Sequence, residues 1–236
     1  MNLKDPLFWE MLYDYILTSL GFSREGDYYS CRILDILLST RMNVVLRSLR
    51  YIMELVSGRT VVVIGDSPRS RCRKLGGAVL IAADSSLEKC LEEGVVPDVV
   101  ATDLDGISTN SLRLKDTLFV VHAHGDNVDR VNRLLPSIEG FFIGTSQFKC
   151  SPRVEVPGGF TDGDRAVFLA YYYGAKKVYL QGFDFSSIGR WLKPSGTRVN
   201  ANIKIAKLAW ARLLLSLLKN TGYEIECFED SCKGWI

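Results

Sequence analysis

The stretch Thr60-Val-Val-Val-Ile64-Gly65 decides the fold class of this chain. It is a short apolar run, rich in β-branched residues and closed by glycine, which is typical of a strand buried inside a parallel sheet. Comparable runs follow at residues 78–83, 98–101, 118–121, 141–144 and 177–180, and residues 223–228 alternate as a closing strand would. Helical patterns lie at residues 85–93, 127–134, 164–173 and about 200–219. This alternation predicts an α/β fold, a mostly parallel sheet with helices on both faces.

Residues 1–57, ahead of the first run, contain no convincing strand. Asp5-Pro6 has the pattern of a helix N-cap followed by proline in the first turn, and Asp27 is placed to cap a second helix. Apolar residues then recur at helical spacing until Gly58, at Val45, Leu49, Ile52, Met53 and Val56. We therefore expect two parts, an α-helical N-terminal extension over residues 1–57 and an α/β domain over residues 58–236.

The composition is that of an ordinary globular protein, with 236 residues of which 47% are hydrophobic and 24% charged. The net charge of +2 provides no general attraction to nucleic acid or to an anionic membrane. No apolar run approaches the roughly 20 residues of a membrane span. Asp5, Pro6 and Glu10 interrupt the N-terminal apolar residues, which is wrong for a signal peptide. These features predict a soluble cytoplasmic protein that binds neither nucleic acid nor membranes.

The cysteines and histidines limit the chemistry further. Six cysteines are scattered without a CxxC pair, which predicts buried free thiols rather than a zinc site or a disulfide framework. The two histidines are His122 and His124, so mechanisms that need three or more imidazoles are excluded. His122-Ala-His124-Gly-Asp126 begins like the HxHxD motif of a binuclear zinc hydrolase, but that site needs further histidines. We favour a role for His124 beside a phosphate or carboxylate, with His122 facing the core or the opposite side.

Acidic and glycine-bearing segments follow the predicted strands, at the ends where parallel sheets bind ligands. They are Gly65-Asp66-Ser67-Pro68, Ala83-Asp84-Ser85, Thr102-Asp103-Leu-Asp105-Gly106, His122-Ala-His124-Gly-Asp126-Asn127, Gly158-Gly-Phe-Thr-Asp162-Gly-Asp164-Arg165 and Gly182-Phe-Asp184. If the topology is right, most of these acids converge on one rim. Two carboxylates about 5 Å apart repel by about 3 kcal/mol at an effective dielectric near 20, so such a cluster needs a cation, a shared proton or backbone hydrogen bonds. Oxygen ligands with few histidines favour Mg²⁺ or Ca²⁺ over zinc, and Mg²⁺ points to a phosphate-bearing substrate.

Each of these segments also has a purely structural interpretation. Asp103-Leu-Asp105 places two carboxylates on the same side of an extended segment, yet the same residues suit a turn. Asp84 and Asp162 are candidate helix N-caps, and Asp126-Asn127 is another. Their joint occurrence at successive strand ends favours a functional site.

Cations that could hold phosphates are present in three places, although most surface lysines and arginines are simply solvated. They are Arg69, Arg71, Arg73 and Lys74 after the first strand, Arg190, Lys193 and Arg198 in a long loop, and Lys204 and Lys207 on the last helix. The loop at residues 186–199 contains Gly189, Pro194 and Gly196, which is the composition of a mobile lid.

Three segments together resemble a known family. They are Pro97-Asp98-Val-Val-Ala-Thr-Asp103-Leu-Asp105-Gly106, His122-Ala-His124-Gly-Asp126-Asn127 and Gly158-Gly-Phe-Thr-Asp162-Gly-Asp164-Arg165. They resemble the archaeal 6-hydroxymethyl-7,8-dihydropterin pyrophosphokinase family, which is related to the motility accessory factor domain and has a catalytic domain similar to thiamin pyrophosphokinase. Leu20-Gly-Phe-Ser-Arg24 followed by Asp27 fits the opening of the family, so the resemblance covers nearly the whole chain. One departure is Gly65-Asp66-Ser67-Pro68-Arg69, where the family usually has a more glycine-rich turn against the nucleotide.

The resemblance implies Mg²⁺-dependent transfer of the terminal diphosphate of ATP to the hydroxymethyl oxygen of a reduced pterin, with release of AMP. It implies that Mg²⁺ is bound, directly or through water, by Asp103, Asp105 and Asp126. The acceptor of the substrate proton would be Asp126 or His124, and the residues against the nucleotide would be Asp84, Ser67, Asn127, Lys204 and Lys207. A carboxylate can accept two parallel hydrogen bonds from a pterin edge, so the pterin would lie against Asp162 or Asp164, with Arg165 and either Phe160 or Phe183 beside it.

Other functions stay open at this stage. A nucleotide-sugar glycosyltransferase would use Asp103-Leu-Asp105 as its metal-binding DxD motif and would lack a pterin pocket. A pyrophosphokinase of the same fold could act on thiamin or another alcohol. A binding or assembly protein would recruit a partner through residues 1–57 and retain the acids without turnover. A monomer and a homodimer are both compatible with the sequence.

Overall fold

The computed structural model describes residues 5–67, 71–188, 200–229 and 231–235. Its centre is one sheet in the order β6-β5-β4-β3-β2-β1-β7-β8, and every neighbouring pair is parallel. The strands are β1 Thr60–Ile64, β2 Val79–Ala83, β3 Val99–Thr102, β4 Leu118–His122, β5 Phe142–Thr145, β6 Val154–Glu155, β7 Lys177–Gln181 and β8 Ile225–Cys227. The predicted parallel α/β fold is confirmed. The one strand that the patterns missed is β6, because two residues are too few to show a periodicity.

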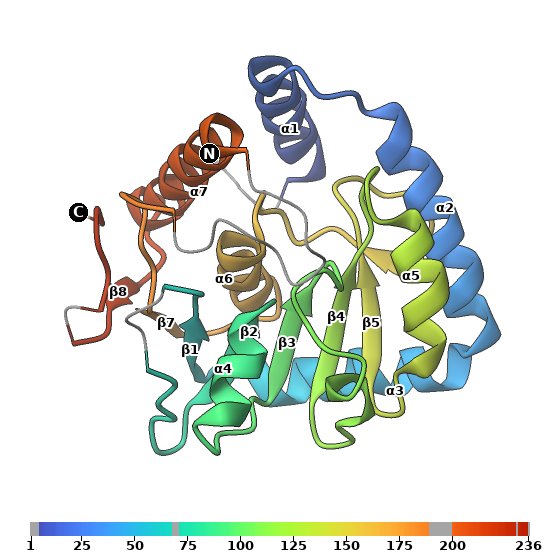
Figure 1. Cartoon of the computed structure of the whole chain (residues 1–236), viewed down its shortest axis with the longest axis horizontal. Helices are drawn as coiled ribbons and strands as arrows, with labels where there is room; N and C mark the ends of the chain where they lie inside the picture. Colours follow the sequence, from blue (N-terminus) through green and yellow to red (C-terminus); the bar gives the residue numbers. More distant parts are fainter. Residues whose placement is uncertain (1–4, 68–70, 189–199, 230, 236) are drawn as a thin grey trace.

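The helices cover both faces of this sheet (Figure 1). They are α1 Pro6–Leu20, α2 Glu25–Thr40, α3 Met42–Val56, α4 Ser86–Glu92, α5 Val128–Leu134, α6 Asp162–Tyr172 and α7 Ala201–Asn220, with short 3₁₀ turns at Ser111–Arg113 and Leu135–Ser137. Helices α1, α6 and α7 contribute to one apolar layer, and α2, α4 and α5 contribute to those on the opposite face. Of the three helices before the sheet, α2 and α3 contact β5, whereas α1 packs against α7.

The strand β1 shows why its apolar run predicted burial on both faces. Val61 and Val63 belong to the layer under α6, whereas Val62 and Ile64 belong to the layer under α4. All four side chains are at most 1% exposed. Because successive side chains of a strand point to opposite faces, only a strand covered on both sides buries an unbroken run of this kind.

The caps of the first two helices differ from each other. Asp5 accepts a hydrogen bond from the backbone N–H of Leu7 at 3.0 Å, so the predicted cap of α1 is confirmed. The prediction that Asp27 caps α2 is wrong, because α2 begins at Glu25 and Asp27 lies inside its first turn, buried. The side chain of Asp27 instead contacts other parts of the molecule, which are described below.

The prediction of free thiols is also wrong. The structure pairs Cys31 with Cys150, Cys72 with Cys90 and Cys227 with Cys232, and leaves no cysteine free. Sequence separation hid the first of these pairs, because Cys31 and Cys150 are 119 residues apart while their Cα atoms are 6.1 Å apart. Pairing depends on which segments the topology makes neighbours, and here α2 lies beside the loop that follows β5.

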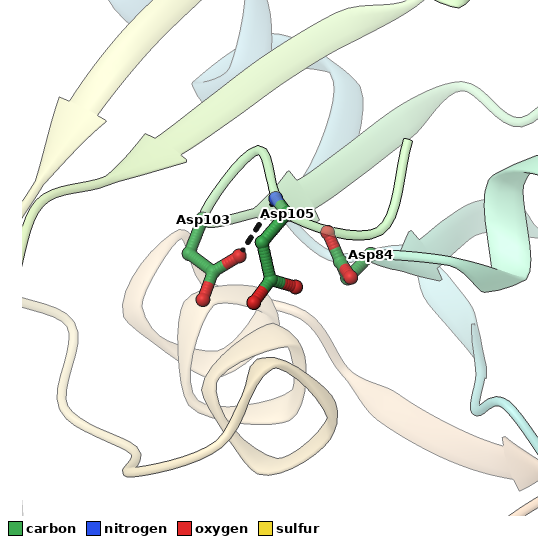
Figure 2. A group of neighbouring side chains, drawn as sticks. All are labelled: Asp84, Asp103 and Asp105. Atoms are coloured by element: carbon green, nitrogen blue, oxygen red, sulfur yellow. Dashed lines mark hydrogen bonds between the residues drawn. The ribbon is translucent and has the colours of Figure 1, made fainter. Parts of the chain in front are cut away.

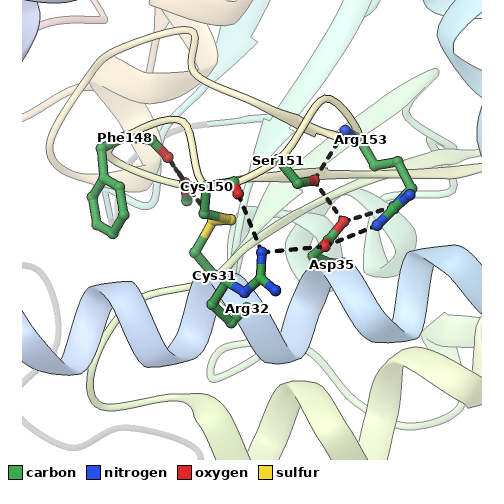
Figure 3. The surroundings of a disulfide bond; sticks show 8 residues. Cys31, Arg32, Asp35, Phe148, Cys150, Ser151 and Arg153 are labelled. Atoms are coloured by element: carbon green, nitrogen blue, oxygen red, sulfur yellow. Dashed lines mark hydrogen bonds and ion pairs between the residues drawn. A yellow bond between two sulfur atoms is a disulfide. The ribbon is translucent and has the colours of Figure 1, made fainter.

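An ion pair supports the same contact between α2 and that loop (Figure 3). Arg153 donates two hydrogen bonds to Asp35, at 2.6 and 2.9 Å, and Ser151 donates a third at 2.5 Å. Burial opposes ionisation of Asp35, but these donors outweigh it and hold the pKa of that carboxyl below its usual value. The N-terminal helices are therefore attached to the sheet by a covalent bond and a charged network together.

Among the described residues, no helix is both long enough and apolar enough to cross a membrane.

Candidate active site

Three aspartates converge where β2 and β3 end. Asp84 follows β2, and Asp103 and Asp105 follow β3; each offers a carboxylate oxygen within 4.8 Å of the others. In the view of Figure 2 the three carboxylates lie next to one another, with that of Asp105 drawn between those of Asp103 and Asp84. The sheet order reverses nearby, since β1 lies between β2 and β7, and ligands of parallel sheets bind at such switch points. The predicted convergence of acids on one rim is confirmed for these three residues.

Asp84 is held in place by the loop after β3. Its Oδ1 accepts hydrogen bonds from the Thr102 hydroxyl at 2.6 Å and from the Gly106 N–H at 3.3 Å. Its backbone has a φ of 45°, a left-handed conformation that non-glycine residues rarely adopt and that recurs at functional sites. A Cβ on Gly106 would lie 1.8 Å from Asp84 Oδ2, so only glycine leaves room for this carboxylate. The loop after β3 thus fixes the position of the Asp84 carboxylate.

Asp103 and Asp105 lie on a turn whose middle residue faces the core. Leu104 has a φ of 69° and is 2% exposed, and its N–H donates to the Thr102 hydroxyl at 2.7 Å. Asp103 Oδ1 accepts the N–H of Asp105 at 3.0 Å. The segment Asp103-Leu-Asp105 is therefore a turn rather than an extended segment, and that turn places both carboxylates in one cluster.

The loop after β4 reaches the same cluster through His124. Its Nε2 lies 3.1 Å from Asp103 Oδ2, and its Nδ1 accepts the N–H of Asp126 at 3.4 Å. Since Nδ1 is the acceptor, Nε2 carries the hydrogen and donates it to Asp103. His124 is thereby oriented by a backbone group on one side and an acid on the other.

Asn127 connects the loops after β3 and β4. Its side-chain oxygen accepts the His124 N–H at 2.9 Å, and its amide donates to the carbonyls of Asp103 at 3.0 Å and His122 at 2.7 Å. Asn127 was predicted to contact a nucleotide or to cap a helix. Its side chain is 1% exposed, and its hydrogen bonds hold the two loops together. Asp126, on the same loop, is exposed and is not one of the three clustered carboxylates.

His122 lies in the core rather than at the cluster. It is 1% exposed, its Nδ1 lies 3.1 Å from the Thr145 hydroxyl, and its Nε2 has no hydrogen-bond partner among the described residues. Burial first, and then the nearby charge of Arg165, lowers the pKa of His122 well below its usual value. A neutral imidazole in the core and a second one at the carboxylates are the arrangement favoured for the two histidines.

The start of α6 brings a further acid to the rim. Asp162 binds Arg165 Nη1 at 2.8 Å. Burial, together with the negative charges of Asp103 and Asp105, raises the pKa of Asp162 to about 6 against the opposing effect of Arg165. Burial and the same neighbours raise the pKa of Asp84 well above its usual value. The rim therefore accumulates negative charge that a bound cation would relieve.

Asp164 has a different environment from Asp162. It is fully buried, and it accepts the N–H groups of Phe160 at 2.6 Å and Thr161 at 2.8 Å together with the Thr161 hydroxyl. Thr161 and Asp164 form the capping box of α6. Both oxygens of Asp164 thus serve the helix start, and of the two acids proposed for a pterin only Asp162 is partly exposed.

The other predicted residues occupy several places. Ser67 donates its N–H to the Gly182 carbonyl at 3.0 Å, and its own carbonyl accepts Lys89 Nζ at 3.0 Å. Lys207 Nζ lies 5.4 Å from the ring centre of Phe22 and 5.6 Å from that of Phe160, and Lys204 is half-buried three residues earlier on α7.

Phe183 is 6% exposed in the core, whereas Phe160 is half-buried. Arg69, Arg190, Lys193, Arg198 and residues 189–199 of the predicted lid lie outside the described residues.

Two residues of the site were not assigned a role from the sequence. Thr102 and Gly106 flank the Asp103-Leu-Asp105 turn and hold Asp84, and both were visible only as neighbours of the acids. Asp84 itself was expected against the nucleotide, and the structure groups it with Asp103 and Asp105. The pairing of β2 with β3 brings these residues together, and no spacing along the chain shows that pairing.

Comparison with known proteins agrees with the resemblance of the motifs. Residues 37–190 match the family described as 6-hydroxymethylpterin diphosphokinase MptE-like. A protein of Pyrococcus furiosus is 40% identical over 225 residues, which is 91% of this chain and 94% of the relative. A protein of Methanocaldococcus jannaschii is 32% identical over 240 residues, with 93% and 97% covered, and one of Methanothermobacter thermautotrophicus is 34% identical over 226 residues, with 91% and 95% covered. All three are named 6-hydroxymethyl-7,8-dihydropterin pyrophosphokinase. With matching motifs, near-complete coverage and a cluster of carboxylates at the carboxyl ends of β2 and β3, the chain belongs to the 6-hydroxymethylpterin diphosphokinase MptE-like family.

Proposed function

We propose that this diphosphotransferase moves the terminal diphosphate of ATP to the hydroxymethyl oxygen of 6-hydroxymethyl-7,8-dihydropterin. The alcohol oxygen forms a bond to the β-phosphorus while the bond between that phosphorus and the α,β-bridging oxygen breaks, so AMP leaves and the alcohol proton passes to a base. The names of the three relatives support the substrate. The observation that carries the proposal is the cluster of Asp84, Asp103 and Asp105 at the carboxyl ends of β2 and β3.

The cluster fits a hard divalent cation. It offers oxygen ligands only, and hydrogen bonds between two loops fix its geometry. The pKa of Asp84 is raised, and a bound cation would lower it. We assign Asp84, Asp103 and Asp105 to Mg²⁺, with Asp126 reaching it through water. Bound Mg²⁺ would neutralise charge on the β- and γ-phosphates of ATP. Lys204, Lys207 and the Ser67 loop are the groups that we assign to the nucleotide.

The proton acceptor follows from the tautomer of His124. Its Nε2 hydrogen is donated to Asp103, and its Nδ1 accepts the N–H of Asp126, so both ring nitrogens are already used in hydrogen bonds within the protein. Asp126 is exposed on the same loop. We therefore assign the proton to Asp126, and we assign to His124 the orientation of Asp103.

The pterin is assigned to the rim beside α6. Asp162 can accept two parallel hydrogen bonds from the 2-amino group and the ring N–H of a reduced pterin, while Arg165 orients that carboxylate. Phe160 is the more exposed of the two candidate aromatic residues, and we assign it to the face of the pterin. Asp164 contributes by fixing the start of α6.

The test is AMP release from ATP and Mg²⁺ with the pterin present or absent, and with EDTA as the control. We expect AMP that depends on the pterin and disappears with EDTA. Thiamin and a nucleoside-diphosphate sugar are run in parallel. AMP formed with thiamin alone, or release of a nucleoside diphosphate from the sugar nucleotide, would overturn the assigned acceptor.

A further inference from the structure

The first turn of α2 lies directly against the loop that carries His124. A Cβ built on Gly26 would lie 2.9 Å from the Cα of Gly125, and a Cβ built on Gly125 would lie 3.3 Å from the Cα of Gly26. Real Cβ atoms almost never approach within 3.0 Å of another heavy atom. The two backbones therefore meet at a pair of glycines, and each glycine leaves room for the other.

Two hydrogen bonds join α2 to this loop, and a third holds the carboxylate of Asp27. Asp27 Oδ1 accepts the N–H of Gly125 at 2.7 Å, and Asp27 Oδ2 accepts the hydroxyl of Tyr13 on α1. The Ser30 hydroxyl donates to the carbonyl of His124 at 2.5 Å. Tyr13, Asp27 and Ser30 are between 1% and 5% exposed, so the side chains that α1 and α2 contribute to these bonds are buried.

His124 is consequently held from two sides. Asn127 connects its loop to Asp103 on the sheet side, and Asp27 and Ser30 connect it to α2 on the other. The imidazole itself contacts Asp103. A change of a few tenths of an ångström in this loop therefore reaches a carboxylate of the cluster.

We infer that Gly26, Asp27 and Ser30 are positioning residues, through which the N-terminal helices set the place of His124 and hence of Asp103. The inference rests on the proposed function for its kinetic consequence, but its structural content does not. The match to the family model begins at residue 37, after these three residues. On this inference the N-terminal helices position a residue of the active site and are not a separate module.

Gly26→Ala is the sharpest test, because alanine favours a helix more than glycine does. The substitution does not strain the backbone, since the φ of Gly26 is not positive, but its methyl group displaces Gly125. We expect kcat to fall at least 10-fold, the KM values for ATP and pterin to change less than 2-fold, and the melting temperature to stay within a few degrees. Gly76→Ala is the matched control, since a Cβ there meets nothing within 4 Å, and we expect wild-type kinetics.

A second pair of variants separates positioning from folding. Asp27→Ala removes the acceptor for Gly125, whereas Asp27→Asn retains an oxygen for that N–H. We expect the alanine variant to lose most of kcat and the asparagine variant to recover much of it. Equal losses in the two variants, or a wild-type kcat in Gly26→Ala, would overturn the inference.

A spectroscopic readout needs no turnover at all. The chain contains two histidines, so two sets of imidazole signals are expected in an NMR spectrum of the substrate-free protein at fixed pH. We expect Gly26→Ala and Asp27→Ala to shift the His124 signals and to leave those of His122 in place. Unmoved His124 signals would refute the positioning role even if the enzyme used a different acceptor, and shifted signals would support it in the same case.

Discussion

Two pairs of aspartates have the same spacing in the sequence but are placed differently in the structure. Asp103 and Asp105 both belong to the carboxylate cluster, because Leu104 turns through a positive φ and its side chain enters the core between them. Asp162 and Asp164 are also two residues apart, but they lie in the first turn of α6. There Asp164 is buried as a helix cap and only Asp162 is partly exposed at the rim. The comparison teaches that an acid-x-acid motif has no fixed chemical meaning until the conformation of its backbone is known.

The largest effect is expected at the first pair. Asp103→Asn and Asp105→Asn each remove a negative charge from the cluster, and we expect AMP release to fall at least about 1,000-fold, equivalent to about 4 kcal/mol of barrier. Because the charges in this cluster repel one another, neither variant should melt at a lower temperature than the wild type. Rates are compared at saturating ATP and pterin, with circular dichroism for the fold. Near-normal activity in both variants would end the assignment of these residues to a metal.

The second pair should divide activity from stability. Asp164→Asn removes a charged acceptor from two buried N–H groups and a hydroxyl, and we expect it to lower the free energy of unfolding by about 2 kcal/mol. Asp162→Asn keeps an acceptor for Arg165 and should change that free energy by no more than about 1 kcal/mol. Its expected effect is a KM for the pterin that rises at least 10-fold.

Chemical denaturation and steady-state kinetics of both variants measure this contrast. The structural role assigned to Asp164 would be refuted if Asp164→Asn were as stable as the wild type. The assignment of Asp162 to the pterin would be refuted if Asp162→Asn bound the pterin normally.

A smaller effect concerns pH. The pKa of Asp162 is raised to about 6 in the folded protein, so the native state holds this proton more tightly than the unfolded chain does. Its contribution to stability is therefore present at low pH and is lost as the pH rises through about 6. In EDTA, we expect the stability of wild type relative to Asp162→Asn to fall by about 1 kcal/mol between pH 5 and pH 7. A difference that does not change with pH would show that the pKa of Asp162 is not raised in the folded protein.

Much of the fold could be predicted because its strands are buried on both faces. Residues 60–64 show this most clearly, since an unbroken β-branched run of this length suits a strand that is covered on both sides. The acids of the rim were also predictable, because parallel strands end at a common edge. The first turn of α6 was harder, since Asp162 and Asp164 have equal claims until a helix start assigns one of them to the cap.

What could not be predicted depends on contacts between distant segments. Nothing beside Asp27 in the chain indicates that it bonds Gly125, and its place before a helical stretch favoured a cap. Cys31 and Cys150 likewise become neighbours only when α2 packs beside β5. Patterns report local periodicity, whereas these contacts are properties of the folded topology.

The bond between Cys31 and Cys150 has a consequence for any attempt to separate the N-terminal helices from the sheet. It closes a covalent ring that contains α3 and the strands from β1 to β5. A protease that cuts once between α3 and β1 would leave both fragments joined, and they would migrate as one species on a gel until a reductant was added. Limited proteolysis followed by reduction therefore traces this connection directly, and it offers a way to release the helices from a molecule that folded with them attached.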